Sequence, residues 1–290
     1  MVILTSNSGN AGLGKETVLQ LAKHSPSQIY LAARTPSKAE AAIQEIKAAV
    51  PSADVKFLNL DLTSFTSIAD AARQFTSQSQ RLDVLINNAG VMALPPGTTK
   101  DGYEIQFGTN HVGHALLTKL LMPTLLATAK RPGSDVRIVN LSSDGHNLAP
   151  SGGVTWDKAK IDALGPWGRY GNSKLANILF ARELAAKYPT ITSVSVHPGL
   201  IATDLYGPNK ASNALLRYGM ALVQPWMFSS VEQGTRNQLW TATAPKDQLK
   251  NGAYYKPVGS LSNGSRYAQN GKMAEKLWEW TEKELASKGF

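Results

Sequence analysis

The chain has 290 residues, of which 42% are hydrophobic, 18% charged and 8% aromatic, with 24 Gly, 15 Pro and no Cys. This composition excludes disordered, collagen-like and coiled-coil chains, and the lack of Cys excludes disulfide scaffolds, thiolate zinc sites and Cys nucleophiles. The formal net charge of +9 is spread along the chain, with no basic run longer than Lys130-Arg131, so we expect a solvated basic surface and no nucleic-acid partner.

Short apolar runs alternate along the chain with longer segments in which apolar residues recur at helical spacing. In chain order, the predicted strands are 2–4, 28–32, 55–60, 84–86, 136–141 and 192–197, and the helices predicted between and after them are 15–23, 37–49, 64–78, 108–128 and 170–187. Nearly continuous apolar strands are typical of sheets buried on both faces. The alternation predicts an α/β fold, a Rossmann-type doubly wound parallel sheet in which residues 1–290 form a single domain.

Two irregular stretches interrupt this alternation. Residues 146–169 contain several Gly and Pro breakers, and residues 205–230 are apolar and aromatic but are interrupted by Gly and Pro. Long irregular segments in compact domains often cover active sites. We therefore predict that residues 205–230 form a substrate lid.

Membrane attachment is not expected from the apolar runs. The leucine-rich stretch 115–129 carries Lys119 and falls short of the roughly 18 to 20 apolar residues of a membrane span. Residues 1–4 are too few for the apolar core of a signal peptide. The sequence thus predicts a cytoplasmic protein without a transmembrane segment.

A glycine motif, Asn10-Ala11-Gly12-Leu13-Gly14, follows the first predicted strand and opens the first helix. Glycines at such a turn let the backbone approach a pyrophosphate, which then lies at the helix N-terminus. A plain tight turn would explain the glycines alone, but their place after a strand of an α/β pattern favours a dinucleotide site.

A second motif, Tyr170-Gly171-Asn172-Ser173-Lys174, begins a predicted helix. The spacing of four places Tyr170 and Lys174 on one helix face. A phenol has an ordinary pKa of about 10, and a neighbouring ammonium favours the phenolate. An isolated pair of this kind would more simply be an exposed helix face.

Four further motifs lie at or near the carboxyl ends of predicted strands, where open α/β sheets bind their ligands. They are Asn87-Asn88-Ala89-Gly90, the helical Asn110, Ser142-Ser143 and His197-Pro198-Gly199. In this order and spacing, the six motifs together resemble the short-chain dehydrogenase/reductase family over nearly the whole chain. Residues 110–114, 142–146 and 173–185 are similar to its retinol-dehydrogenase-like branch.

The resemblance implies catalytic roles for four residues. Tyr170 would exchange a proton with the substrate oxygen, and Lys174 would favour the phenolate and bind the nicotinamide ribose. Ser143, preferred to Ser142 by its register at the strand end, would hydrogen-bond the substrate oxygen. Asn110 would support a water that links Lys174 to solvent. These roles amount to acid–base catalysis combined with stabilisation of a developing oxyanion.

The resemblance also implies a nicotinamide dinucleotide site. Its residues would be Ser8, Asn10, Gly12, Leu13 and Gly14 at the pyrophosphate, Asp61 and Leu62 at the adenine, Asn88, Ala89 and Gly90 at the adenosine ribose, Tyr170 and Lys174 at the nicotinamide ribose, and Pro198, Gly199 and Thr203 at the nicotinamide. The chain departs from the family pattern at Asn7-Ser8, where Thr-Gly is usual, so we expect weakened cofactor binding at that corner.

The second predicted strand ends in Arg34, and Lys38 follows in the next helix. An acidic residue in this region accepts hydrogen bonds from the ribose hydroxyls of NAD, whereas a cation suits the 2′-phosphate of NADP. We therefore predict NADP(H) as the cofactor, although a surface arginine would also explain Arg34.

The function predicted on these grounds is reduction of a bulky apolar ketone or aldehyde, or oxidation of the matching alcohol. Aromatic residues flank the expected site: Trp156, Trp167, Tyr206, Trp226 and Phe228. A catalytically idle NADP-binding sensor or scaffold and an epimerase or dehydratase remain as alternatives, and a homodimer is compatible with the sequence. His111 and His114 lack a third ligand, so packing is favoured over a metal site.

Overall fold

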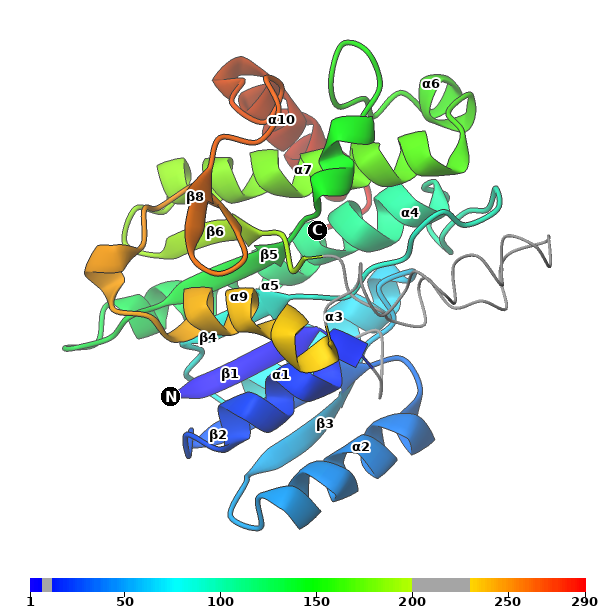
Figure 1. The fold of residues 1–290 in the computed structure, drawn as a ribbon. Coiled ribbons are helices and arrows are strands. Elements are labelled where there is room, and N and C mark those ends of the chain that lie inside the picture. The colour runs from blue at the N-terminus through cyan, green and yellow to red at the C-terminus, as the bar shows by residue number, and fades with distance from the viewer. Residues whose placement is uncertain (7–11, 200–229) are drawn as a thin grey trace.

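The computed structural model describes residues 1–6, 12–199 and 230–290. Within them, eight strands form one sheet in the order β3-β2-β1-β4-β5-β6-β7-β8 (Figure 1). The strands are β1 (Val2–Ser6), β2 (Gln28–Ala33), β3 (Val55–Asn59), β4 (Val84–Asn87), β5 (Arg137–Leu141), β6 (Thr192–Val196), β7 (Tyr254–Lys256) and β8 (Ser260–Ser262). All neighbours pair in parallel except β7 and β8, which are antiparallel. The predicted doubly wound parallel sheet is confirmed.

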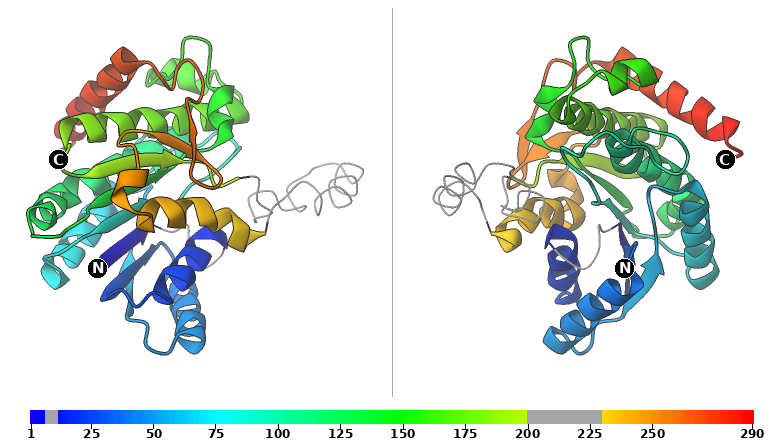
Figure 2. Two further views of the ribbon diagram at one scale, coloured as in Figure 1. Left: turned by 60° about the vertical axis from the view of Figure 1, so that its left-hand side comes forward. Right: turned by 90° about the vertical axis from the view of Figure 1, so that its right-hand side faces the viewer.

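Helices cover both faces of the sheet (Figures 1 and 2). One face carries α1 (Gly12–Ala22), α2 (Pro36–Ala49) and α9 (Val231–Thr243), and the other carries α3 (Phe65–Gln78), α5 (Gly113–Ala129) and α7 (Pro166–Lys187). Helix α10 (Gly271–Ser287) packs against α7. Short helices are α4 (Ile105–Phe107), a π-helical turn (Gly108–Val112), α6 (Lys158–Asp162) and two 3₁₀ helices (Asp144–Leu148 and Lys246–Gln248). The order of the strands reverses between β1 and β4, where ligands of such sheets bind.

The predicted strands match the six long strands within two residues at each end, but the helices differ more. The irregular stretch 146–169 includes α6 and the first turn of α7, which begins at Pro166 and not at residue 170. Pro at the first position of a helix fits because its missing N–H needs no partner there. Residues 205–229 of the expected lid lie outside the described residues, so the lid and the single domain stay predictions.

The apolar helical run that begins with α4 is longer than its sequence pattern suggested. Residues Ile105–Ala129 form one continuous run of 25 residues that is long and apolar enough to cross a membrane by length and composition. However, 61% of its apolar window is buried inside the protein, as expected of a core helix. Leu116, Leu117 and Leu121 belong to the core beneath the sheet. This run alone does not establish a transmembrane segment.

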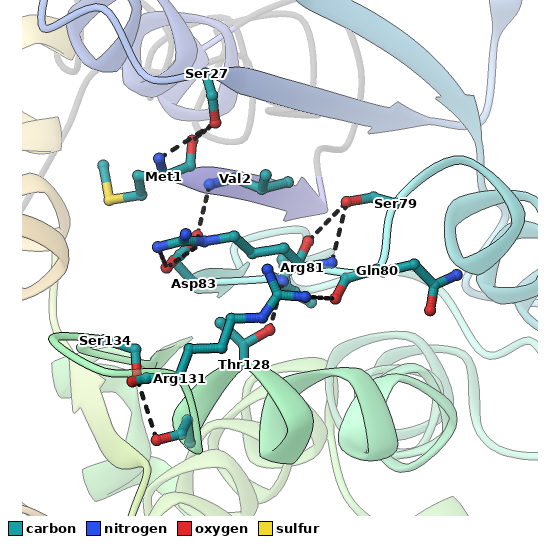
Figure 3. A network of polar contacts seen from close by, with 12 residues as sticks. Met1, Val2, Ser27, Ser79, Gln80, Arg81, Asp83, Thr128, Arg131 and Ser134 are labelled. Atoms are coloured by element: carbon teal, nitrogen blue, oxygen red, sulfur yellow. Dashed lines mark hydrogen bonds and ion pairs between the residues drawn. The ribbon is translucent and has the colours of Figure 1, made fainter.

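A polar network holds the amino edge of the sheet (Figure 3). The buried carboxylate of Asp83, just before β4, accepts hydrogen bonds from the Val2 amide at 2.7 Å and from Arg81 Nε at 2.8 Å. The neighbouring Leu82 amide donates to Thr128 Oγ1 at the end of α5, at 3.0 Å. These bonds tie β1, β4 and α5 together at the end of the sheet opposite the predicted site.

Candidate active site

Helix α7 brings the predicted pair together at the carboxyl edge of the sheet. Tyr170 and Lys174 are both buried, and Lys174 Nζ lies 5.7 Å from the centroid of the Tyr170 ring. The helix can approach the loop after β5 because of Gly171. A Cβ atom at this position would lie 2.5 Å from the backbone carbon of Leu148.

Lys174 is a buried cation held by a backbone group. Its Nζ donates a hydrogen bond to the Leu141 carbonyl at the end of β5, at 3.0 Å, and it has no ion-pair partner among the described residues. Burial lowers the pKa of Lys174 from 10.5 to about 8. A buried charge without a counter-charge costs stability. A buried lysine of this kind is therefore typical of a functional site and not of a structural core.

The two serines after β5 have different surroundings. Ser142 is buried, and its Oγ donates to the Lys174 carbonyl at 2.7 Å. Ser143 is half-buried, and its Oγ accepts a hydrogen bond from the Gly145 amide at 3.0 Å. The hydroxyl proton of Ser143 is therefore still available for a second partner, which fits the predicted choice of Ser143 over Ser142.

Gly145 lies between Ser143 and Tyr170, and no pattern in the sequence marks it as a site residue. A Cβ atom on Gly145 would lie 2.6 Å from Tyr170 Cε1 and 3.3 Å from Ser143 Oγ. Any side chain there would push the phenol away from the serine. The structure thus places Ser143, Tyr170 and Lys174 in one cluster, as predicted.

Asn110 lies in the π-helical turn and is fully buried. Its Nδ2 donates to the Val91 carbonyl at 2.9 Å and to Ser173 Oγ at 2.8 Å, and its Oδ1 accepts from the Val91 amide at 2.8 Å. The side chain therefore joins the loop after β4 to α7. A Cβ atom on Gly90 would lie 3.3 Å from Lys174 Nζ and 3.4 Å from Asn110 Oδ1, so Gly90 leaves room beside both.

The glycine turn at the start of α1 is described from Gly12 onward. Gly12 has a φ of +66°, a conformation that favours glycine, and Gly14 is buried. The Leu13 carbonyl accepts a hydrogen bond from Thr17 Oγ1 at 2.6 Å. Ser8, Asn10 and the atypical Asn7-Ser8 corner lie outside the described residues, as does Thr203.

Gln238 of α9 is a site residue that sequence reasoning missed. It is fully buried, and its Nε2 donates to Thr17 Oγ1 in α1 and to Asn88 Oδ1 after β4, the latter at 3.3 Å. One amide thereby connects the helix of the glycine turn to the end of β4. Ala89, the next residue along this loop, is buried.

The residues expected at the adenosine end lie at the ends of β2 and β3. Arg34 directly follows β2, and it and Lys38 are exposed; Arg34 has no ion-pair partner among the described residues. Although burial raises the pKa of Asp61, hydrogen bonds from Thr63 and the ion pair with Lys100 outweigh it and hold that pKa below 3.8. Leu62 is buried.

The loop after β6 faces the short strand β7. Pro198 and Gly199 are half-buried, and Gly199 has a φ of +100°. A Cβ atom on Gly199 would contact Pro257 Cγ at 3.5 Å. Just before them, the His197 carbonyl accepts a hydrogen bond from Asn237 Nδ2 of α9 at 2.7 Å.

The two histidines near Asn110 contact packing partners. His114 Nδ1 lies 3.0 Å from the Asn110 carbonyl, and His111 Nε2 lies 3.3 Å from Thr281 Oγ1 in α10. Burial lowers the pKa of His111 to about 3 and that of His114 to about 4, so both rings are neutral near pH 7. Among the described residues, no group of three or more metal-ligating side chains occurs.

Comparisons with known proteins identify the family of this chain. A family model described as short chain dehydrogenase matches residues 2–214. The chain belongs to the short-chain dehydrogenase/reductase family. It is 38% identical over 293 aligned positions to the short-chain dehydrogenase/reductase drtF of Aspergillus calidoustus, covering 96% of this chain and 91% of that protein.

One further relative and one solved structure are similar to the chain over most of its length. Mouse retinol dehydrogenase 12 is 36% identical, with 96% of this chain and 84% of that protein covered. A crystal structure of an uncharacterised Mycobacterium paratuberculosis protein is 28% identical, with a TM-score of 0.72 over 97% of this chain and 92% of the other. The resemblance seen in the motifs is thus confirmed. Members of the family are oxidoreductases that transfer hydride with a nicotinamide cofactor.

Proposed function

We propose that this oxidoreductase uses NADP(H) and interconverts a bulky apolar aldehyde or ketone with its alcohol. The observation that carries the proposal is the cluster of Ser143, Tyr170 and Lys174, in which the buried ammonium lies 5.7 Å from the phenol ring. Gly145 allows the phenol to lie close to the serine. This arrangement suits proton transfer to a carbonyl oxygen far better than it suits an inert helix face.

Each side chain has a defined part in the proposed reduction. When bound, a nicotinamide cofactor would supply the hydride. Ser143 Oγ, which accepts from the Gly145 amide, donates its own proton in a hydrogen bond to the substrate oxygen. Tyr170 transfers its hydroxyl proton to that oxygen, and the Lys174 cation stabilises the phenolate that remains. Asn110 holds the loop after β4 against α7, the helix that carries Lys174.

The residues present fit a dinucleotide along the carboxyl edge of the sheet. Gly90 leaves open the space beside Lys174 Nζ that a Cβ atom would occupy, and Gly12 gives the start of α1 its turn. Lys174 would hold the ribose hydroxyls, and the first amides of α1 would face the pyrophosphate. Arg34 would bind a 2′-phosphate, with Lys38 adding a second positive charge nearby.

An apolar substrate is supported by side chains around the cluster. Trp167, in the first turn of α7, is 48% exposed and its ring lies 6.4 Å from that of Tyr170; Leu148 is 50% exposed. Trp156 does not join them, since it stacks against Trp280 of α10. The other expected aromatic residues, Tyr206, Trp226 and Phe228, lie outside the described residues. The relative named retinol dehydrogenase 12 also points to an apolar alcohol or aldehyde.

The cofactor preference is tested by initial rates with NADPH and with NADH, using decanal as substrate and acetaldehyde as its small counterpart. A charge-assisted contact from Arg34 predicts that NADPH exceeds NADH in kcat/KM by about tenfold or more. Arg34→Asp should erase or invert that preference. Lys23→Asp, an equal change of charge at the far end of α1, should leave it unchanged.

Other outcomes would redirect the proposal. Equal kcat/KM values for the two cofactors in the parent protein would contradict the assignment of Arg34. NADPH binding without turnover of either aldehyde, or of the corresponding alcohols with NADP⁺, would favour the catalytically idle binding protein.

A further inference from the structure

The histidine of the 142–146 motif lies beside the candidate catalytic serine but does not belong to the catalytic cluster. His146 is in the 3₁₀ helix Asp144–Leu148, which begins directly after Ser143. Only 1% of the surface of His146 is exposed. Nothing in the proposed proton transfer uses this ring.

Both ring nitrogens of His146 have backbone partners. Nδ1 lies 2.7 Å from the Ser143 carbonyl, and Nε2 lies 2.9 Å from the Ser265 amide. A carbonyl can only accept and an amide can only donate, so Nδ1 carries the proton and Nε2 is the acceptor. Burial lowers the pKa of His146, which favours this neutral form.

The surroundings of the ring are shaped to hold it. The Tyr254 ring of β7 packs edge-on against it, with the ring centroids 5.3 Å apart. Gly264, with a φ of +63°, approaches so closely that a Cβ atom there would lie 3.1 Å from His146 Nε2. The imidazole thus bridges the turn after β5 and the segment that follows β8.

The same turn is fixed on its other side by Asp144. The Asp144 carboxylate accepts from Lys256 Nζ at 2.9 Å and from the Tyr254 hydroxyl at 3.1 Å, both on β7. His197 Nε2 lies 3.7 Å from the same carboxylate. The polar and charged residues that face the turn are therefore His197 after β6, Tyr254 and Lys256 on β7, and Ser265 after β8.

We propose that His146 is a positioning residue for Ser143: its imidazole, held between the Ser143 carbonyl and the Ser265 amide, fixes the turn that directs the Ser143 hydroxyl toward the substrate oxygen. The inference rests on the role of Ser143 in the proposed function. The Ser143 carbonyl accepts from the His146 amide at 3.0 Å as well as from the ring, so two bonds from one residue orient its peptide group. A small rotation of that group would displace the hydroxyl that Gly145 now holds.

Three substitutions separate the two contacts of the ring. His146→Phe keeps a ring against Tyr254 but removes both hydrogen bonds. The amide of His146→Asn replaces the Nδ1 donor to Ser143, and the amide oxygen of His146→Gln replaces the Nε2 acceptor for Ser265. His24→Phe, an exposed histidine at the end of α1, is the matched control. For each, kcat and KM for decanal with NADPH, the Kd of NADPH and the thermal midpoint are measured, in the parent and in the Ser143→Ala background.

We expect His146→Phe to lower kcat by about tenfold, with the Kd of NADPH within about twofold of the parent. His146→Asn should recover most of that loss, whereas His146→Gln should not. In the Ser143→Ala background, His146→Phe should have little further effect on kcat, because residues that act through one group are not additive. A merely structural histidine would lower kcat equally in both backgrounds.

Each remaining outcome overturns the inference, and each identifies which step of it is wrong. Recovery by His146→Gln alone would assign the role to the Ser265 contact, and an unchanged kcat in His146→Phe would exclude any role in positioning. If Ser143→Ala itself keeps full activity, the proposed role of Ser143 fails, and the inference fails with it. If Ser143→Ala is impaired and His146→Phe is not, only the inference fails.

Discussion

At the amino edge of the sheet the buried carboxylate of Asp83 forms an ion pair with Arg81. At the carboxyl edge the buried ammonium of Lys174 donates to a backbone carbonyl and lies near the Tyr170 ring, and no described residue provides a counter-charge. The amino edge also pairs its backbone amides, as with Val2 and Asp83. The carboxyl edge instead places glycines where side chains would fill the space, as at Gly90 and Gly145.

The difference separates interactions that hold the fold from those that serve chemistry. A buried charge with a partner and hydrogen bonds can stabilise the protein, while an unpaired one costs stability and must be retained for another reason. The space that Gly90 leaves beside Lys174 also serves chemistry, because it admits a ligand. Substitutions at the two edges should therefore affect different quantities: activity at the carboxyl edge and the free energy of unfolding at the amino edge.

The largest effect is expected from Tyr170→Phe. Removing the phenol hydroxyl takes away the proposed proton donor, so kcat for decanal with NADPH should fall by about 10²-fold or more. The free energy of unfolding should stay within about 1 kcal/mol of the parent, since the ring is kept. Tyr188→Phe, at the other end of α7, serves as the control and should retain full activity. Near-normal kcat in Tyr170→Phe would reject this residue as the acid.

Asp83→Asn is the matching test at the amino edge. Loss of the carboxylate should lower the free energy of unfolding by about 2 kcal/mol, while kcat stays within about twofold. Asp70→Asn removes an exposed partner of Arg73 on α3 and should cost less than about 0.5 kcal/mol. Urea unfolding of both variants measures the difference. An Asp83→Asn protein that is as stable as the parent would contradict the structural role of this network.

The pH dependence of stability follows from the same carboxylate. Burial raises the pKa of Asp83, but hydrogen bonds from Arg81 and from the Val2 amide outweigh it and hold the pKa below 3.8. Because the folded pKa lies below that of the unfolded chain, the contribution of Asp83 is present above the unfolded value and is lost as the pH falls through the folded one. The stability difference between parent and Asp83→Asn should therefore shrink in acid.

The sequence predicts the elements whose pattern is local. The long parallel strands contain short runs of apolar and β-branched residues that mark them in the sequence. The Tyr170–Lys174 spacing needs only one turn of helix to bring its members together. β7 and β8 were missed because three residues show no periodicity. α9 was missed because it buries Thr235, Asn237 and Gln238, so apolar periodicity does not mark its inner face.

The contacts that complete the site join residues far apart in the chain, which is why they were not predicted. Gln238 contacts Asn88 across 150 positions, and His146 contacts Ser265 across 119. Gly145 matters only because α7 carries the Tyr170 ring to it, and neither segment shows this in its own composition. Close approaches of this kind depend on the assembled fold.

The smallest effect is expected from the titration of Lys174. As the pH rises, activity should fall while the free energy of unfolding rises, which distinguishes the carboxyl edge from the amino edge. Burial lowers the pKa of this ammonium from 10.5 to about 8. Above that pH the free protein loses the cation that would stabilise the phenolate, so kcat/KM for NADPH at saturating decanal should halve near pH 8 and decline further. A profile that stays flat to about pH 9.5 would contradict the assigned role.

Between about pH 8 and 10.5 the unfolded chain binds more protons at this lysine than the folded protein does, so its contribution to the free energy of unfolding rises with pH while activity falls. Lys174→Met should remove this rise. The comparison is made by urea unfolding of both proteins without cofactor at pH 7 and pH 9.5. Because the uncompensated charge costs stability at pH 7, the variant should be at least as stable as the parent there. A marked loss of stability on removing Lys174 would mean that the carboxyl edge, like the amino edge, uses its buried charge to hold the fold.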